Sequence, residues 1–250
     1  MQLVSEGLVP RISSETVRRI LSSHRLKPWQ IHYWMTPKAP RDAEFFQRVN
    51  ELIDLYSRPL ADDETVYSVD EKTSLQPRPR LHPTQPAQPG CPNRVEHEYR
   101  RAGALNLFGA FDTRTGKVLG RTFERQRQRE FIAFLEHLDA QTPPPIRTIH
   151  LVCDNVSTHQ GKQVQLWLAS HPRFQMHFTP VGCSWINQIE QWFSILQRKR
   201  FRLVDFASKE YLAQQMDQFI AEWNTDAHPF NWSANSAAKV MAGHPIQEAA

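Results

Sequence analysis

The feature that most constrains the fold of this chain is an alternation of strand-like and helix-like segments. Runs of β-branched or apolar residues predict strands at 65–70, 104–111, 118–123, 149–153 and 174–178. Apolar residues at helical spacing predict helices at 43–56, 130–138, 164–169, 185–199 and 208–224. A hairpin followed by strands that alternate with helices predicts an α/β fold with a mixed central sheet and helices on both faces.

Length and composition fit one large domain with a small appendage. The chain has 250 residues, of which 40% are hydrophobic, so it can bury a sizeable core. A net charge of +4 suits a nucleic-acid partner, although it also suits many other proteins. Three widely spaced cysteines predict no disulfide framework. Neither a signal peptide nor an apolar run of about 18 residues is visible, so we expect a cytoplasmic protein.

The chain divides into three parts by pattern. Residues 1–40 hold a basic helix, which Ser13 or Ser14 can cap, and a linker. Residues 41–232 form the main domain, and 233–250 form a C-terminal tail. Within the main domain, 76–103 is expected to be an exposed insertion, since six prolines fall between Pro77 and Pro92.

Three acidic residues are the candidate catalytic and metal-binding groups. Asp70 and Asp154 each follow a short apolar strand, and the carboxyl ends of neighbouring parallel strands meet at one crevice. Glu190 lies at the edge of the apolar stripe of the helix 185–199. Glu71 is a competing candidate, although strand alternation points it to the opposite face. The alternatives are a turn or capping role for each aspartate and a solvated position for the glutamate.

Convergence of these acids would require a metal. Carboxylates that share one site repel each other, so a cation must compensate their charge. Oxygen ligands favour Mg²⁺ or Mn²⁺. Two such ions can activate an attacking oxygen and stabilise a leaving oxygen at a phosphodiester. If the three acids converge, they therefore form a two-metal phosphodiester site; spacing alone leaves the structural roles of these acids open.

Specific strings around the acids resemble a known family. These strings are Ser68–Lys72 (SVDEK), Leu105–Phe108 (LNLF), Thr115–Val118 (TGKV), Cys153–His159 (CDNVSTH), Phe178–Pro180 (FTP) and Ser184–Ser194 (SWINQIEQWFS). With them the chain resembles the IS630 group of the IS630/Tc1/mariner transposase superfamily over nearly its whole length. The resemblance implies an RNase H-like fold and a DDE triad of Asp70, Asp154 and Glu190.

The resemblance also implies an activity and partners. A transposase of this group cleaves at the inverted repeats of a transposon and joins the freed 3′-hydroxyl to target DNA, commonly at TA. The implied cofactor is two Mg²⁺ or Mn²⁺ ions, and the implied partners are DNA and a second copy of the chain, at the bacterial nucleoid. Two alternatives stay open: a DNA-binding remnant that does not transpose alone, and an RNase H-like nuclease without strand transfer.

Several residues near the acids are expected to support them. Asn155 and His159 follow the second acid within the matched string, where they either orient it, contact substrate, or serve packing and capping. Asn187 and Trp185 are expected to set the angle of the helix that carries Glu190.

Two basic clusters are candidate DNA contacts. The family carries helix-turn-helix modules before its catalytic domain, and 1–40 resembles the end of the second one, so recognition of specific ends is expected to be incomplete. The residues are Arg18, Arg19, Arg25 and Lys27 in that segment, and Arg198, Lys199, Arg200 and Arg202 after the helix 185–199. For both clusters, an ordinary solvated or helix-terminal role is the alternative.

Overall fold

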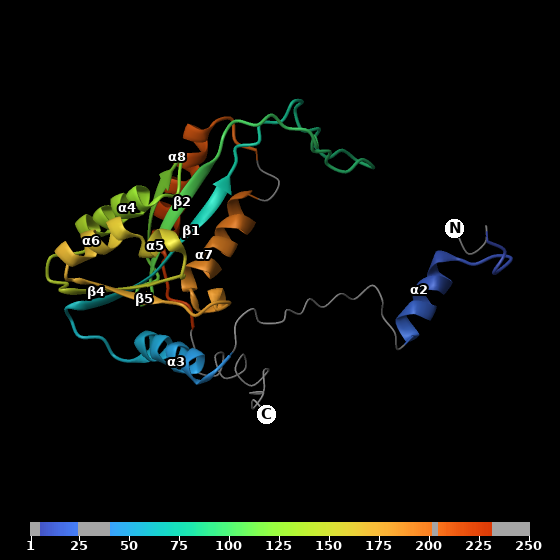
Figure 1. Ribbon diagram of the computed structural model, residues 1–250. Helices are drawn as coiled ribbons and strands as arrows, with labels where there is room; N and C mark the ends of the chain where they lie inside the picture. Colours follow the sequence, from blue (N-terminus) through green and yellow to red (C-terminus); the bar gives the residue numbers. More distant parts are fainter. Residues whose placement is uncertain (1–5, 25–40, 202–204, 232–250) are drawn as a thin grey trace. The chain divides into compact units, whose positions relative to one another are not determined.

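A computed structural model describes residues 6–24, 41–201 and 205–231 (Figure 1). The chain separates into two compact units, Met1–Pro37 and Lys38–Ala250. The first unit contains the helix α2 (Ser14–Ser23), which Ser13 caps by accepting a hydrogen bond from the Thr16 amide. None of the residues of α2 is buried.

The second unit contains the sheet and its covering helices. Its elements are α3 (Ala43–Ser57), β1 (Glu64–Leu75), β2 (Leu105–Asp112), β3 (Val118–Phe123), α4 (Gln128–Gln141), β4 (Thr148–Cys153), α5 (Ser157–Gln160), α6 (Lys162–Ser170), β5 (Phe174–Phe178), the 3₁₀ turn η1 (Ser184–Ile186), α7 (Gln188–Leu196), the π-helical segment η2 (Gln197–Phe201) and α8 (Lys209–Thr225). In the described ranges, no helix is long and apolar enough to cross a membrane.

The sheet has five strands in the order β3-β2-β1-β4-β5. Strands β1, β4 and β5 are parallel, whereas β1, β2 and β3 form an antiparallel meander. The pairing of β1 with β4 ends at Ser68↔Val152, but β1 continues beside β2 as far as Leu75. The edge of β1 beyond Ser68 is therefore open on the side of β4. The expected mixed α/β sheet is confirmed.

Helices cover both faces of the sheet. On one face, α4 and α6 pack over the sheet through buried residues such as Phe131, Phe134, Leu135 and Val164. On the other face, α7 and α8 bury Trp192, Phe193, Met216 and Phe219. Helix α3 packs on the same face as α7, against Val66 and Val152. Figure 1 shows α4, α5 and α6 together on the side of the sheet away from α7.

The segment between β1 and β2 is an irregular arm. Three isolated bridges hold its two limbs together: Arg80↔Tyr99, Gln85↔Arg94 and Gln88↔Cys91. Most of its side chains are exposed, and Figure 1 shows it running beyond the ends of β1 and β2. Proline and the lack of an apolar pattern explain why no longer ladder forms.

Two elements differ from the sequence-based expectation. Strand β1 does not end at Asp70, because pairing with β2 carries it on to Leu75. The predicted helix 185–199 is broken: η1 ends before Asn187, the α-helix begins at Gln188, and a π-helical segment follows from Gln197. Hydrogen bonds between the Asn187 side chain and β1 cause the break before Gln188.

Candidate active site

Asp70 and Asp154 follow two aligned positions on parallel strands. Ser68 of β1 pairs with Val152 of β4, and each acid lies two residues further along its chain. Because residues two apart on a strand share a face, the register directs both carboxylates to the same edge of the sheet. Both acids line one cleft of about 210 Å³, with Glu71, Thr73, Gln126, Val156 and Thr158.

Asn187 ties the Asp70 carboxylate to the start of α7. Its side-chain amide donates to Oδ2 of Asp70 at 3.0 Å and to the carbonyl of Val69 at 3.1 Å. Its Oδ1 accepts a short hydrogen bond from the Ser68 hydroxyl, which in turn accepts from the Ile189 amide at 2.9 Å. The side chain thus bonds β1 while its own backbone is extended, so the α-helix begins one residue later.

Asp70 is buried and short of compensating charge. Burial is the main reason that the pKa of Asp70 rises to about 7, although the hydrogen bond from the Glu71 amide lowers it. The negative charges of Asp154, Glu190 and Glu71 raise this pKa further. All three acids are thus close enough to Asp70 to act on its charge.

His159 joins Asp154 to Glu71 from a fully buried position. Its Nε2 lies 2.9 Å from Oε1 of Glu71, and its Nδ1 lies 3.2 Å from the backbone carbonyl oxygen of Asp154. Oδ1 of Asp154 lies 3.0 Å from Nδ1 but has no hydrogen-bond partner among the described residues. Burial alone lowers the pKa of His159, but hydrogen bonds to Asp154, Cys153 and Glu71 outweigh burial and raise the pKa to about 12. The buried ring therefore bonds the Glu71 side chain and the Asp154 backbone, and it lies beside the Asp154 carboxylate.

Glu71 and Asn155 take different positions. The side chain of Glu71 lies on the face of β1 opposite to the face that Asn187 contacts, as strand alternation predicts. At the edge of the sheet, however, Glu71 lines the same cleft as Asp70. Asn155 is exposed, and its Oδ1 accepts a hydrogen bond from the Gln160 side chain.

Glu190 lies beside the cleft rather than inside it. It is exposed in the first turn of α7 and lines a neighbouring hollow of about 370 Å³ that also includes Trp185 and Asn187. Because the Asn187 amide bonds Asp70, the hollow and the cleft adjoin at this residue. Trp185 is partly buried and packs against the cluster under α3.

A divalent metal fits the chemistry of these donors. Carboxylate oxygens are the ligands that Mg²⁺ and Mn²⁺ prefer, and a cation would compensate the charge of the buried Asp70 carboxylate. Among the described residues, however, no group of three His, Cys, Asp or Glu side chains is placed to hold one ion. The structure brings two of the three expected ligands into one cleft and leaves Glu190 next to it.

The basic candidates fall into three groups: paired with an acid, exposed, and outside the described residues. In α2, Arg18 donates two hydrogen bonds of 2.7 Å to Glu15, and Arg19 is exposed. In η2, Arg198 and Lys199 are exposed, whereas Arg200 pairs with Glu222 and lies 5.0 Å over the Phe219 ring. Three candidates lie outside the described residues: Arg25, Lys27 and Arg202.

Reasoning from the sequence missed two neighbours of the acids. The Ser68 hydroxyl on β1 accepts a hydrogen bond from the Ile189 amide at the start of α7. Gln126 lines the cleft from the loop before α4. The signal for Ser68 was its place in the matched string at 68–72. For Gln126 no comparable signal exists, since its approach to the cleft depends on the packing of α4.

The sheet order and the covering helices are those of an RNase H-like fold. The chain's fold matches the Mos1 mariner paired-end complex with Mn (TM-score 0.53, 16% identity, 88% of this chain, 66% of that chain). It also matches a pre-cleavage Mos1 transpososome (0.54, 15%, 88%, 66%) and the Mos1 catalytic domain (0.50, 13%, 75%, 85%). At these identities the likeness concerns the fold alone.

Sequence comparison gives the family. Residues 65–213 match the DDE superfamily endonuclease family, and the chain belongs to it. The chain is also 29% identical over 134 residues to an uncharacterized 39 kDa protein of insertion element IS630 from Shigella sonnei. That alignment covers 54% of this chain and 38% of the Shigella protein. The resemblance to the IS630 group, drawn from the strings around the acids, is confirmed.

Proposed function

We propose that this chain is the catalytic part of an IS630-type DNA transposase, with Asp70, Asp154 and Glu190 as its catalytic triad. The observation that carries the proposal is the β1–β4 register, which aligns Ser68 with Val152 and so brings Asp70 and Asp154 to one cleft. Glu190 acts electrostatically on Asp70 from the first turn of α7. Membership of the DDE superfamily endonuclease family supports the same reading.

The proposed reaction has two steps. Water attacks a phosphodiester at a transposon inverted-repeat end, and the bond to the 3′-oxygen breaks to leave a free 3′-hydroxyl. That hydroxyl then attacks a phosphodiester of target DNA at a TA site. A bond forms between the 3′-oxygen and the target phosphorus, and the bond from that phosphorus to the target strand's own 3′-oxygen breaks to leave a 3′-hydroxyl. The Mos1 neighbours were solved as a paired-end complex and a pre-cleavage transpososome, which supports transposon DNA as a partner. A second copy of the chain, bound to the same DNA, belongs to the proposal.

The cofactor would be two Mg²⁺ or Mn²⁺ ions held by the three acids. Such ions supply activation of the attacking oxygen and stabilisation of the leaving oxygen; the Mos1 paired-end complex was obtained with Mn. The protein's own part is to position the acids. Asn187 fixes Asp70 against β1, and buried His159 holds Asp154 and Glu71.

An endonuclease assay tests this proposal. Purified chain with Mg²⁺ or Mn²⁺ should nick DNA that carries the element's ends, and Asp154→Asn should lower the rate at least 100-fold while DNA binding is kept. The matched control is Asp62→Asn, an exposed aspartate before β1, which should nick like the wild type. If Asp154→Asn nicks as fast as the control, the triad is wrong. Nicking without joining to a target would instead indicate a nuclease.

A further inference from the structure

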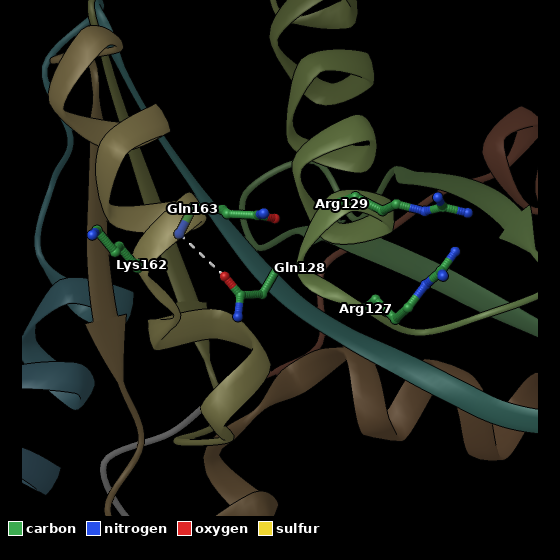
Figure 2. A pocket seen from close by; sticks show the side chains of 5 residues that line it. All are labelled: Arg127, Gln128, Arg129, Lys162 and Gln163. Carbon is green, nitrogen blue, oxygen red and sulfur yellow. Dashed lines mark hydrogen bonds between the residues drawn. The ribbon is translucent and has the colours of Figure 1, made fainter.

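A cationic groove outside the acidic cleft has no assigned role. It has a volume of about 460 Å³ and is lined by Arg127, Gln128, Arg129, Lys162 and Gln163, from the beginnings of α4 and α6 (Figure 2). In Figure 2, the two glutamines lie between the arginines on one side and Lys162 on the other. All five lining residues carry polar or charged groups, with cations at both margins.

A hydrogen bond within the groove connects the beginnings of the two helices. Oε1 of Gln128 accepts a hydrogen bond of 3.2 Å from the Gln163 amide in the first turn of α6. This approach requires Gly161, since a Cβ there would lie 2.1 Å from the Gln128 side chain. This hydrogen bond links the beginnings of α4 and α6, which carry the cations.

The groove keeps an excess of positive charge. Glu130 accepts hydrogen bonds from Arg127 and Arg129, and these lower the pKa of Glu130 to about 2. Three cations and one carboxylate leave a formal charge of +2. Lys162 is exposed and forms no ion pair with the residues that the structure describes. Arg129 keeps 70% of its side chain exposed. Both are therefore open to an anionic ligand.

Two segments of chain link the residues of the groove to those of the acidic cleft. Gln126 lines the cleft, and Arg127 of the groove follows it directly. Thr158 of α5 lines the cleft, and Lys162 begins the next helix. The groove therefore lies next to the acidic cleft, and cations replace carboxylates from one to the other.

We propose that this groove binds the phosphate backbone of duplex DNA on one side of the reactive phosphodiester. The proposal rests on the proposed function, since it takes DNA as the substrate. Guanidinium groups suit phosphate oxygens in geometry, and Lys162 adds a point charge at the opposite margin. No base contact is involved, so the groove contributes affinity and register without sequence specificity.

Salt-dependent binding of the full chain tests the groove separately from catalysis. The probe is a fluorescent 30-base-pair duplex in EDTA, so no nicking occurs, and anisotropy gives Kd from 50 to 300 mM NaCl. The variant is Arg129→Gln with Lys162→Gln, which spares the Arg127–Glu130 pair. The control is Lys117→Gln with Arg147→Gln, two exposed cations at the end of the sheet where β1 and β4 begin.

Loss of two phosphate contacts should reduce the slope of log K against log salt by about 1.8 and weaken Kd at 100 mM about tenfold or more. The control should keep the wild-type slope. Unchanged binding by the groove variant, or an equal loss in the control, overturns the proposal, and circular dichroism verifies that both variants are folded. Wild-type binding together with a failed Asp154 test would reject the triad but not the groove; a wild-type chain that binds no DNA would reject both.

Discussion

At the residue scale, the hydrogen bonds of Asn187 unite the catalytic candidates. One amide side chain reaches Asp70, the Val69 carbonyl and the Ser68 hydroxyl, and it is almost completely buried. An amide suits this place because it donates to a carboxylate and accepts from a hydroxyl at once. Asn187 is therefore best described as a positioning residue for Asp70.

Replacement of Asn187 by alanine should lower both stability and activity. The change leaves the Val69 carbonyl and the Ser68 hydroxyl without this partner, and we expect a loss of about 2–4 kcal/mol in the free energy of unfolding, measured with urea. The kcat of nicking should fall with little change in KM, because the variant still binds its substrate but no longer orients Asp70. Asn50→Ala, at an exposed position of α3, should cost under about 0.5 kcal/mol. A fall confined to KM would contradict the positioning role.

At the scale of elements, tight turns hold the sheet against its last helix. The β2–β3 turn closes through Gly116, whose φ is +74° and whose amide bonds the Asp112 carbonyl at 2.8 Å. The same turn receives the indole of Trp223 from α8, which donates to the Gly116 carbonyl at 2.8 Å. The backbone of His228 lies so close that a Cβ on Gly116 would be 2.1 Å from it.

Two glycine substitutions separate backbone conformation from close packing. Gly116→Ala should cost about 3 kcal/mol or more, because a positive φ is unfavourable for alanine and the His228 backbone must also move. Gly90→Ala in the irregular arm has a φ of +80° but nothing within 4 Å of the added Cβ, so it should cost about 1 kcal/mol. Urea unfolding of both variants measures the difference, and equal costs would show that the contact with His228 is unimportant.

At the scale of the whole molecule, two ionisable groups that are removed from water make stability depend on pH in opposing directions. Asp70 has a raised pKa, whereas His177 on β5 has a pKa lowered to about 4. Burial is the main cause of the lowered pKa of His177, and the positive charge of His150 lowers this pKa further. Glu51 opposes the shift and Arg58 reinforces it.

The lowered pKa of His177 predicts that the folded protein loses stability in acid. An unfolded histidine takes up a proton near pH 6.5, but the folded ring resists until about pH 4. Its contribution is therefore fully present above pH 6.5 and is lost as pH falls towards 4. Between pH 7 and 5, the wild type should lose about 1–2 kcal/mol more than His177→Gln, with an allowance for partial exposure. Urea unfolding at both pH values tests this, and parallel losses would exclude His177 as the cause.

Local periodicity in the sequence predicted the mixed sheet and most helices. The strings around Asp70, Asp154 and Glu190, rather than their spacing, indicated these acids as the candidate triad. The tertiary structure decided the rest. Helix α7 begins at Gln188 because Asn187 bonds a strand more than a hundred residues earlier. His159 is buried between two acids, and Glu190 lies beside the cleft. Such outcomes depend on contacts between distant segments, which local patterns do not encode.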